Sequence, residues 1–226
     1  MVRVRDAAEE GVMSEFDDEE YESFELDGAG RSAEPVKKTT GSGAGGDDDL
    51  EDDDDFDDES DLEDAADDEI DFVLAAYRED GQPYVQSLGK DLANDLDELI
   101  IQLRRLPGDA GALGFVSLVE EVFVITRVRG QHVQVLLSDA AAAADWPIAR
   151  DVVDYLGEEP IDEDEDEEEG EPIGDLGIVA DLGLNDFDMG AIIDNLDLSS
   201  VEMLVEVADK IKLNPQFRKA VEAAVG

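Results

Sequence analysis

The sequence predicts an α+β fold in which an antiparallel sheet of about five strands packs helices on one face. Three observations support it: apolar runs separated by turn signals, one strongly amphipathic helical segment among them, and a series of short helical patterns near the C-terminus. We expect four parts: a disordered acidic N-terminal tail at residues 1–69, an α+β core at 70–156, a disordered acidic loop at 157–172, and a helical C-terminal portion at 173–226 that packs on the core.

The two acidic segments are recognised from their charge. Seventeen of the 23 residues from 47 to 69 are acidic, and residues 157–172 hold 11 acidic side chains and no basic one. Such runs repel themselves and hold too few apolar groups to form a core, so both are expected to be disordered.

The core should begin with a hairpin and a helix. Residues 72–77 form an apolar strand, Glu79-Asp80-Gly81 is a turn signal, and residues 83–88 return. Leucine and isoleucine then recur at helical spacing from 92 to 106, with Asp91 as the expected N-cap and Pro107 after the last turn.

A three-stranded meander follows at residues 113–118, 122–129 and 133–137, with Gly130-Gln131 as a two-residue turn. Residues 139–145 and a segment opened by Pro147, with Asp145 as its expected cap, are helix candidates. In the C-terminal portion, Ser199-x-x-Glu202 is a capping-box pattern that predicts the start of a helix.

Composition excludes several chemistries. The chain has no cysteine, so disulfides, thiolate nucleophiles and cysteine-bound metals are absent, which fits a reducing cytoplasm. His132 is the single histidine, and a lone histidine without an orienting partner is more typical of a turn than of a catalytic base. We expect neither a cofactor nor enzymatic activity.

The net charge of −48 argues against direct nucleic-acid binding, because a phosphate backbone requires clustered Lys and Arg. Anionic membrane surfaces are disfavoured for the same reason, and no apolar run approaches the roughly 20 residues of a spanning helix.

Four aromatic residues are candidates for binding a partner. Phe16, Tyr21 and Phe24 lie among acidic residues of the tail, a pattern that can fold onto a basic, apolar groove; the alternative is a solvated tail with incidental aromatics. Trp146 is either a core anchor at a helix start or an exposed interface residue.

Acidic pairs in the C-terminal portion allow a metal-binding interpretation. Asp186 and Asp188 form a D-x-D pattern, and paired carboxylates can bind Mg²⁺. In a chain with 64 acidic residues such pairs arise by chance, and helix caps are the simpler explanation.

Seven short motifs resemble the actinobacterial family of tRNA adenosine deaminase-associated proteins. They are FVLAAYREDG at 72–81, LRRLPG at 103–108, GALGF at 111–115, LLSD at 136–139, DWPIAR at 145–150, GDLGI at 174–178 and DLG at 181–183. The likeness covers residues 70–226 and implies association with a tRNA adenosine deaminase, but it carries over no functional residue.

The chain cannot be the deaminase itself. Zinc deaminases need H-x-E and P-C-x-x-C, whereas here His132 is followed by Val133 and Gln134 and there is no cysteine.

Three hypotheses follow from these observations. The first is a non-catalytic accessory partner of a tRNA adenosine deaminase, the second is an acidic polyanion mimic or chaperone-like binder of another basic protein, and the third is an enzyme that uses aspartates and a divalent metal.

Overall fold

The computed structural model describes residues 62–108, 111–158 and 170–225 of the 226-residue chain. All of them belong to one of the two units into which the chain divides, Asp55–Gly226. Most of the predicted tail and residues 159–169 of the predicted acidic loop lie outside the described residues.

The centre of the fold is a six-stranded antiparallel sheet in the order β2-β1-β3-β4-β5-β6. The predicted α+β class, antiparallel sheet and meander are confirmed, and the sheet gains a two-residue strand, β6, which pairs with Leu136 and Leu137 of β5. The strands are β1 Ile70–Glu79, β2 Gln82–Ser87, β3 Ala112–Leu118, β4 Val122–Arg129, β5 His132–Leu137 and β6 Ile173–Gly174.

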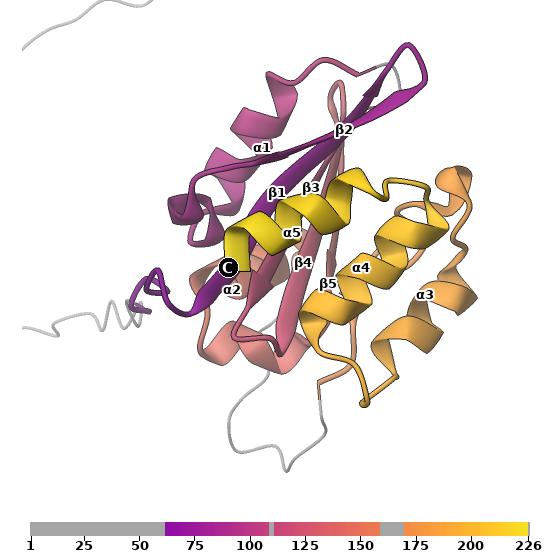
Figure 1. The fold of residues 1–226 in the computed structure, drawn as a ribbon. Helices are drawn as coiled ribbons and strands as arrows, with labels where there is room; N and C mark the ends of the chain where they lie inside the picture. The colour runs from indigo at the N-terminus through magenta and orange to yellow at the C-terminus, as the bar shows by residue number, and fades with distance from the viewer. Residues whose placement is uncertain (1–61, 109–110, 159–169, 226) are drawn as a thin grey trace, which may run out of the picture. The chain divides into compact units, whose positions relative to one another are not determined.

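Helices cover both faces of the sheet (Figure 1). The expectation that they pack on one face is therefore wrong, although the fold class stands. On one face lie α1 Leu96–Arg104 and α2 Pro147–Leu156; on the other lie α3 Asp186–Ile193, α4 Ser200–Lys210 and α5 Gln216–Val225.

The side chains of the central strands explain the two helical layers. In β4, Val124 belongs to the core beneath α1 and α2, whereas Phe123 and Ile125 belong to the core beneath α3, α4 and α5. Every residue of β3 and all of β4 except Arg129 are buried. Strands that bury both faces read as nearly continuous apolar runs, so their alternation does not reveal a solvated face.

The predicted turns are close to those observed. Asp80 and Gly81 join β1 to β2, with φ of 51° and 75°, and Glu79 pairs directly with Gln82. Positive φ at both central residues is the geometry that matches the twist of a two-residue hairpin. Arg129 likewise pairs with His132 across the predicted Gly130-Gln131 turn.

Two predicted helix caps are corrected. The segment expected as one helix from 92 to 106 begins with a 3₁₀ helix, Lys90–Ala93, and α1 starts only at Leu96. Its cap is Asp95, whose side chain accepts a hydrogen bond from the Glu98 N–H at 2.8 Å, rather than Asp91. Trp146, not Asp145, occupies the N-cap position of α2, with Pro147 in its first turn.

The C-terminal portion is tied to the sheet by polar contacts as well as by its apolar core. The capping box of Ser199 and Glu202 at the start of α4 is confirmed. At the other end of α4, Arg78 of β1 donates from Nη2 to the Ile211 carbonyl at 2.7 Å. A cation at this position also complements the negative end of the helix dipole.

The helices that the structure describes are all too short or too polar to cross a membrane.

We predict that Phe217 is a main anchor of α5. Its buried ring meets Phe115 and Phe72 edge-on, at centroid distances of 5.0 and 6.1 Å. Phe217→Ala should lower the free energy of unfolding by about 3–5 kcal/mol, measured by urea denaturation. The control is Phe187→Ala. Phe187 is 82% exposed, so this substitution should change the free energy of unfolding by less than about 0.5 kcal/mol. Equal effects of the two substitutions would contradict this packing.

Candidate functional site

A groove of about 890 Å³ opens where the β3–β4 turn, the end of β5 and the α3–α4 connection meet. We call it the acidic groove. Its lining consists of Glu120, Glu121, Ser138, Asp139, Gly170, Glu171, Pro172, Leu176, Ile193, Asp194, Leu196, Leu198 and Met203.

The floor of the acidic groove is apolar. Ile193 and Met203 are buried parts of the core beneath α3, α4 and α5, and Leu176 and Leu198 pack against that core. Leu196 is different because 80% of it is exposed. An apolar surface of this kind, surrounded by polar groups, is typical of an interaction site.

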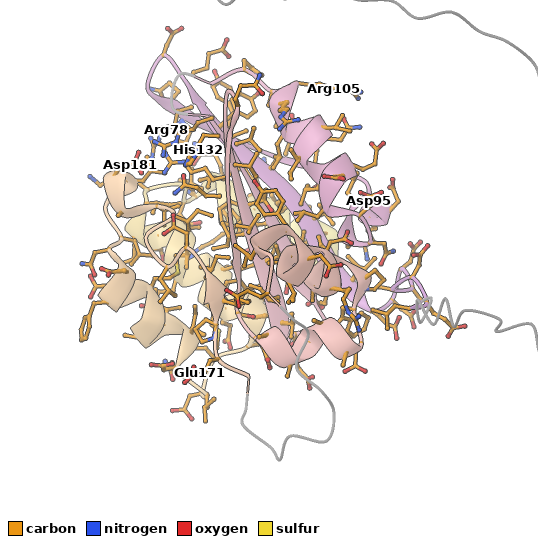
Figure 2. The ribbon with its side chains drawn as sticks, turned by 180° about the vertical axis from the view of Figure 1, so that it is seen from behind. Arg78, Asp95, Arg105, His132, Glu171 and Asp181 are labelled. Atoms are coloured by element: carbon orange, nitrogen blue, oxygen red, sulfur yellow. The ribbon has the colours of Figure 1, made fainter. Side chains whose placement is uncertain are left out.

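The rim of the acidic groove carries charge of one sign. Five carboxylates belong to the lining, and among the described residues no Lys, Arg or His does. Figure 2 shows Glu171 at the opposite end of the molecule from Arg78, His132 and Asp181. The five carboxylates are Glu120, Glu121, Asp139, Glu171 and Asp194.

The rim is held by a strained turn between β3 and β4. Val119 and Glu120 have φ of 47° and 59°, a left-handed conformation that is unfavourable for residues with a Cβ and most of all for valine. Three hydrogen bonds join this turn to other segments. The Val119 N–H donates to the Glu69 carbonyl at 2.8 Å, and the Glu120 N–H donates to Asp71 Oδ2 at 2.8 Å. The Glu120 carbonyl accepts from the Ser200 N–H at 2.9 Å. Strain that the surroundings maintain is a common property of functional sites.

Two buried serines connect the same turn to α4. Ser117 Oγ lies 2.8 Å from Asp71 Oδ2 and 2.7 Å from Ser200 Oγ. A serine nucleophile would need a base such as histidine, but His132 begins β5 at the other end of the molecule from Glu171 (Figure 2). We assign these contacts a structural role: the hydroxyl groups of Ser117 and Ser200 join α4 to the sheet.

A second polar cluster surrounds Arg127 of β4. This arginine is 2% exposed, and its Nη1 donates to the Ile178 carbonyl at 2.7 Å. It forms a two-pronged ion pair with Asp181, with Nη1–Oδ1 and Nη2–Oδ2 distances of 2.5 and 2.8 Å. The hydrogen bonds from Arg127 hold the pKa of Asp181 below its usual value.

Two of the aspartates near residue 180 have structural partners. Besides the pairing of Asp181, Asp188 Oδ2 accepts a hydrogen bond at 2.9 Å from Nδ2 of Asn185, the residue that caps α3. Within residues 62–108, 111–158 and 170–225, no three Asp, Glu or His side chains are grouped so that they could hold a metal ion.

An acidic pocket of about 440 Å³ lies between α1 and α2. Asp95, Asp97, Asp151 and Asp154 line it together with Tyr155. Burial raises the pKa of Asp151, as do the neighbouring carboxylates, while a hydrogen bond from the Leu96 N–H opposes the rise. Like charges around a partly buried carboxyl destabilise its ionised form.

Of the four residues predicted to bind a partner, Trp146 alone lies among the described residues. Phe16, Tyr21 and Phe24 lie outside the described residues. Trp146 is half-buried and packs against the core beneath α1 and α2, on the sheet face opposite α3, α4 and α5. Their part in binding stays a prediction.

The acidic groove was hardly recognisable from the sequence. Its five rim carboxylates come from four separate segments, and acidic residues are common throughout the chain. The available signal was Leu196, a large apolar residue between Asn195 and Asp197.

Comparison with known proteins identifies the family. Residues 71–214 match the family described as Rv3753c-like tRNA adenosine deaminase-associated protein. The chain belongs to this family. It is 34% identical over 160 residues to Protein Rv3753c of Mycobacterium tuberculosis (strain ATCC 25618 / H37Rv), covering 70% of this chain and 91% of that protein. No solved structure matches it.

The family match contains the whole lining of the acidic groove, from Glu120 to Met203, and Trp146, but not Phe16, Tyr21 or Phe24.

The GDLGI and DLG motifs lie in the segment that joins β6 to α3. Asp175 accepts hydrogen bonds from Gln134 Nε2 and the Gly177 N–H, and Asp181 binds Arg127. These two motifs therefore attach the C-terminal helices to β4 and β5.

We predict that Asp181→Asn destabilises the fold at neutral pH by about 1–2 kcal/mol, a modest loss for a charged hydrogen bond because Asp181 is 52% exposed. Since the pKa of Asp181 is lowered on folding, its contribution is present above the usual value of 3.8 and is lost as pH falls through the folded-state pKa. Urea unfolding of both proteins at pH 7 and at decreasing pH should show the two stabilities converging. Asp197→Asn, at an exposed carboxylate in the α3–α4 connection, is the control; a difference between wild type and Asp181→Asn that persists in acid would contradict the assignment.

We expect the opposite sign for Asp151→Asn. A pKa raised on folding means that ionised Asp151 opposes folding at neutral pH, so the amide should stabilise the protein there. The gain should shrink as pH falls and the wild-type carboxyl becomes protonated in both states. Thermal unfolding across this pH range measures it, and a loss of stability at pH 7 would show that the hydrogen bond from the Leu96 N–H outweighs burial and the repulsion from neighbouring carboxylates.

Proposed function

We propose that this protein is a non-catalytic accessory partner of a tRNA adenosine deaminase, in the context of A-to-I editing of tRNA wobble positions, and that it acts through protein–protein contacts. Membership of the tRNA adenosine deaminase-associated family is the observation that carries this proposal. The family description names the association and gives no mechanism.

The residue content supports an accessory role. Base deamination by the zinc enzymes needs a metal held by histidine and cysteine and a glutamate that moves protons. This chain holds no cysteine and a single histidine, so it cannot build that zinc site.

Electrostatics support a protein partner rather than RNA. A deaminase that binds tRNA presents a basic surface to the phosphates, and a chain of net charge −48 is attracted to such a surface and repelled by tRNA. Contact with the deaminase could cover its RNA-binding surface or compete with tRNA for it.

A polyanion mimic or chaperone-like binder of another basic protein is the second candidate. The acidic runs at residues 47–69 and 157–172 favour it. Binding of this kind would depend on charge alone and would not distinguish one basic protein from another.

We predict that the full chain binds the tRNA adenosine deaminase of its own organism with micromolar or better affinity. The measurement is isothermal titration calorimetry at low and moderate salt. The control is an unrelated basic protein whose net charge is similar to that of the deaminase. Binding of the deaminase that persists as salt rises, with weaker binding of the control, is the expected result because short-range contacts survive screening.

Two outcomes would contradict the proposal. Absence of binding to the deaminase at both salt concentrations removes the partner. Equal binding of both basic proteins, fading together as salt rises, favours the polyanion mimic instead.

A further inference from the structure

We propose that the acidic groove is the docking site for one basic, amphipathic segment of the deaminase. The apolar side chains of that segment would enter the groove, and its Lys or Arg side chains would face the rim. This inference rests on the proposed function, because it assigns a surface to the partner named there.

The size of the groove suits a short segment. Its volume of about 890 Å³ lies within the range of roughly 300–1,000 Å³ of pockets that enclose a small ligand. A few side chains fill such a space. Recognition of an amphipathic helix works in this way, with apolar residues on one helical face entering a groove.

The apolar floor requires an apolar anchor. Leu196 is 80% exposed at the groove, whereas the neighbouring Ile193 and Met203 are buried in the core. An apolar side chain of the partner that covered Leu196 would remove its own surface and that of Leu196 from water. Such burial is the main source of affinity at the centre of an interface.

The rim determines the charge of the segment. In the part of the chain that the structure describes, five carboxylates and no basic side chain line the groove, so its potential attracts cations and repels phosphates. The acidic runs of this chain at 47–69 and 157–172 are poor occupants for the same reason. A basic segment of another protein satisfies both the floor and the rim.

One side of the rim is already arranged before any partner binds. Glu120 sits in the strained β3–β4 turn, whose backbone is held by Asp71, Glu69 and Ser200. A preformed rim lowers the ordering cost of association, so a short segment can bind with useful affinity.

The test is the affinity of full-length variants for the deaminase. Leu196→Ser removes the exposed anchor and should weaken binding by about 10-fold or more, as expected for a central interface residue. Phe187→Ser is the matched control, because Phe187 is equally exposed, lies on α3 and does not line the groove. Its affinity should stay within about 2-fold of wild type.

A pair of charge reversals tests the rim. Glu171→Lys with Asp194→Lys should weaken binding by about 10-fold or more, since like charges would then face the partner. Asp97→Lys with Asp154→Lys makes the same change in net charge at the pocket between α1 and α2 and should cost much less. All four side chains are exposed, and far-UV circular dichroism with thermal unfolding checks that each variant folds.

The outcomes separate the two proposals. If wild type binds the deaminase and both groove variants match their controls, the groove inference is wrong and the proposed function stands; the groove is then covered by another segment or a second copy. If the two charge variants weaken binding equally, general polyanion attraction replaces the groove.

If wild type does not bind the deaminase, the proposed function fails. A designed helical peptide with leucine on one face and lysine on the other, and its scrambled form, then test the groove alone. If the helical peptide binds wild type and binds the Leu196→Ser variant more weakly, the assignment of a basic amphipathic occupant to the groove stands. If the scrambled peptide binds equally well, that assignment is wrong.

Discussion

Burial of the central strands on both faces is the constraint on which the rest of this structure depends. Side chains of β1, β3 and β4 point alternately into two separate cores, and neither core is closed by the sheet itself. Because β-strands place successive side chains on opposite faces, one layer of helices cannot cover both sets. The segment from α3 to α5 must therefore return to the sheet after residues 157–172, and the groove forms where that returning segment meets the ends of the strands.

Arg127 shows how the returning segment is attached. A buried guanidinium is costly unless its charge is paired and its donors are satisfied. Here Asp181 and the Ile178 carbonyl supply partners, and both belong to the segment between β6 and α3. Displacing this segment would expose the core beneath α3, α4 and α5. It would also remove Asp181 from the buried charge of Arg127. Arg78, which is half-buried, makes a comparable attachment by donating a hydrogen bond to the Ile211 carbonyl at the C-terminal end of α4.

Local signals were predictable from the sequence, and long-range ones were not. The Asp80-Gly81 turn and the capping box of Ser199 and Glu202 depend on residues within a few positions of each other, and both occur. The second helical layer and β6 depend on which strands are neighbours, which alternation alone does not specify. The start of α1 was missed because Asp91 and Asp95 are both suitable caps. The groove could not be predicted because its rim carboxylates resemble every other acidic residue until the fold places them in one groove with Leu196.

The location of charge matters more than its amount for what this protein can recognise. Exposed carboxylates spread over a surface attract any cation weakly, and salt screens them within about 10 Å at 0.1 M. Carboxylates around an apolar floor act differently, since binding there requires that charge and apolar groups match together. The strained turn at Val119 and Glu120 fixes one side of this arrangement, and hydrogen bonds from neighbouring segments maintain it. In the proposed docking, selectivity therefore comes from the few carboxylates that the fold holds in place.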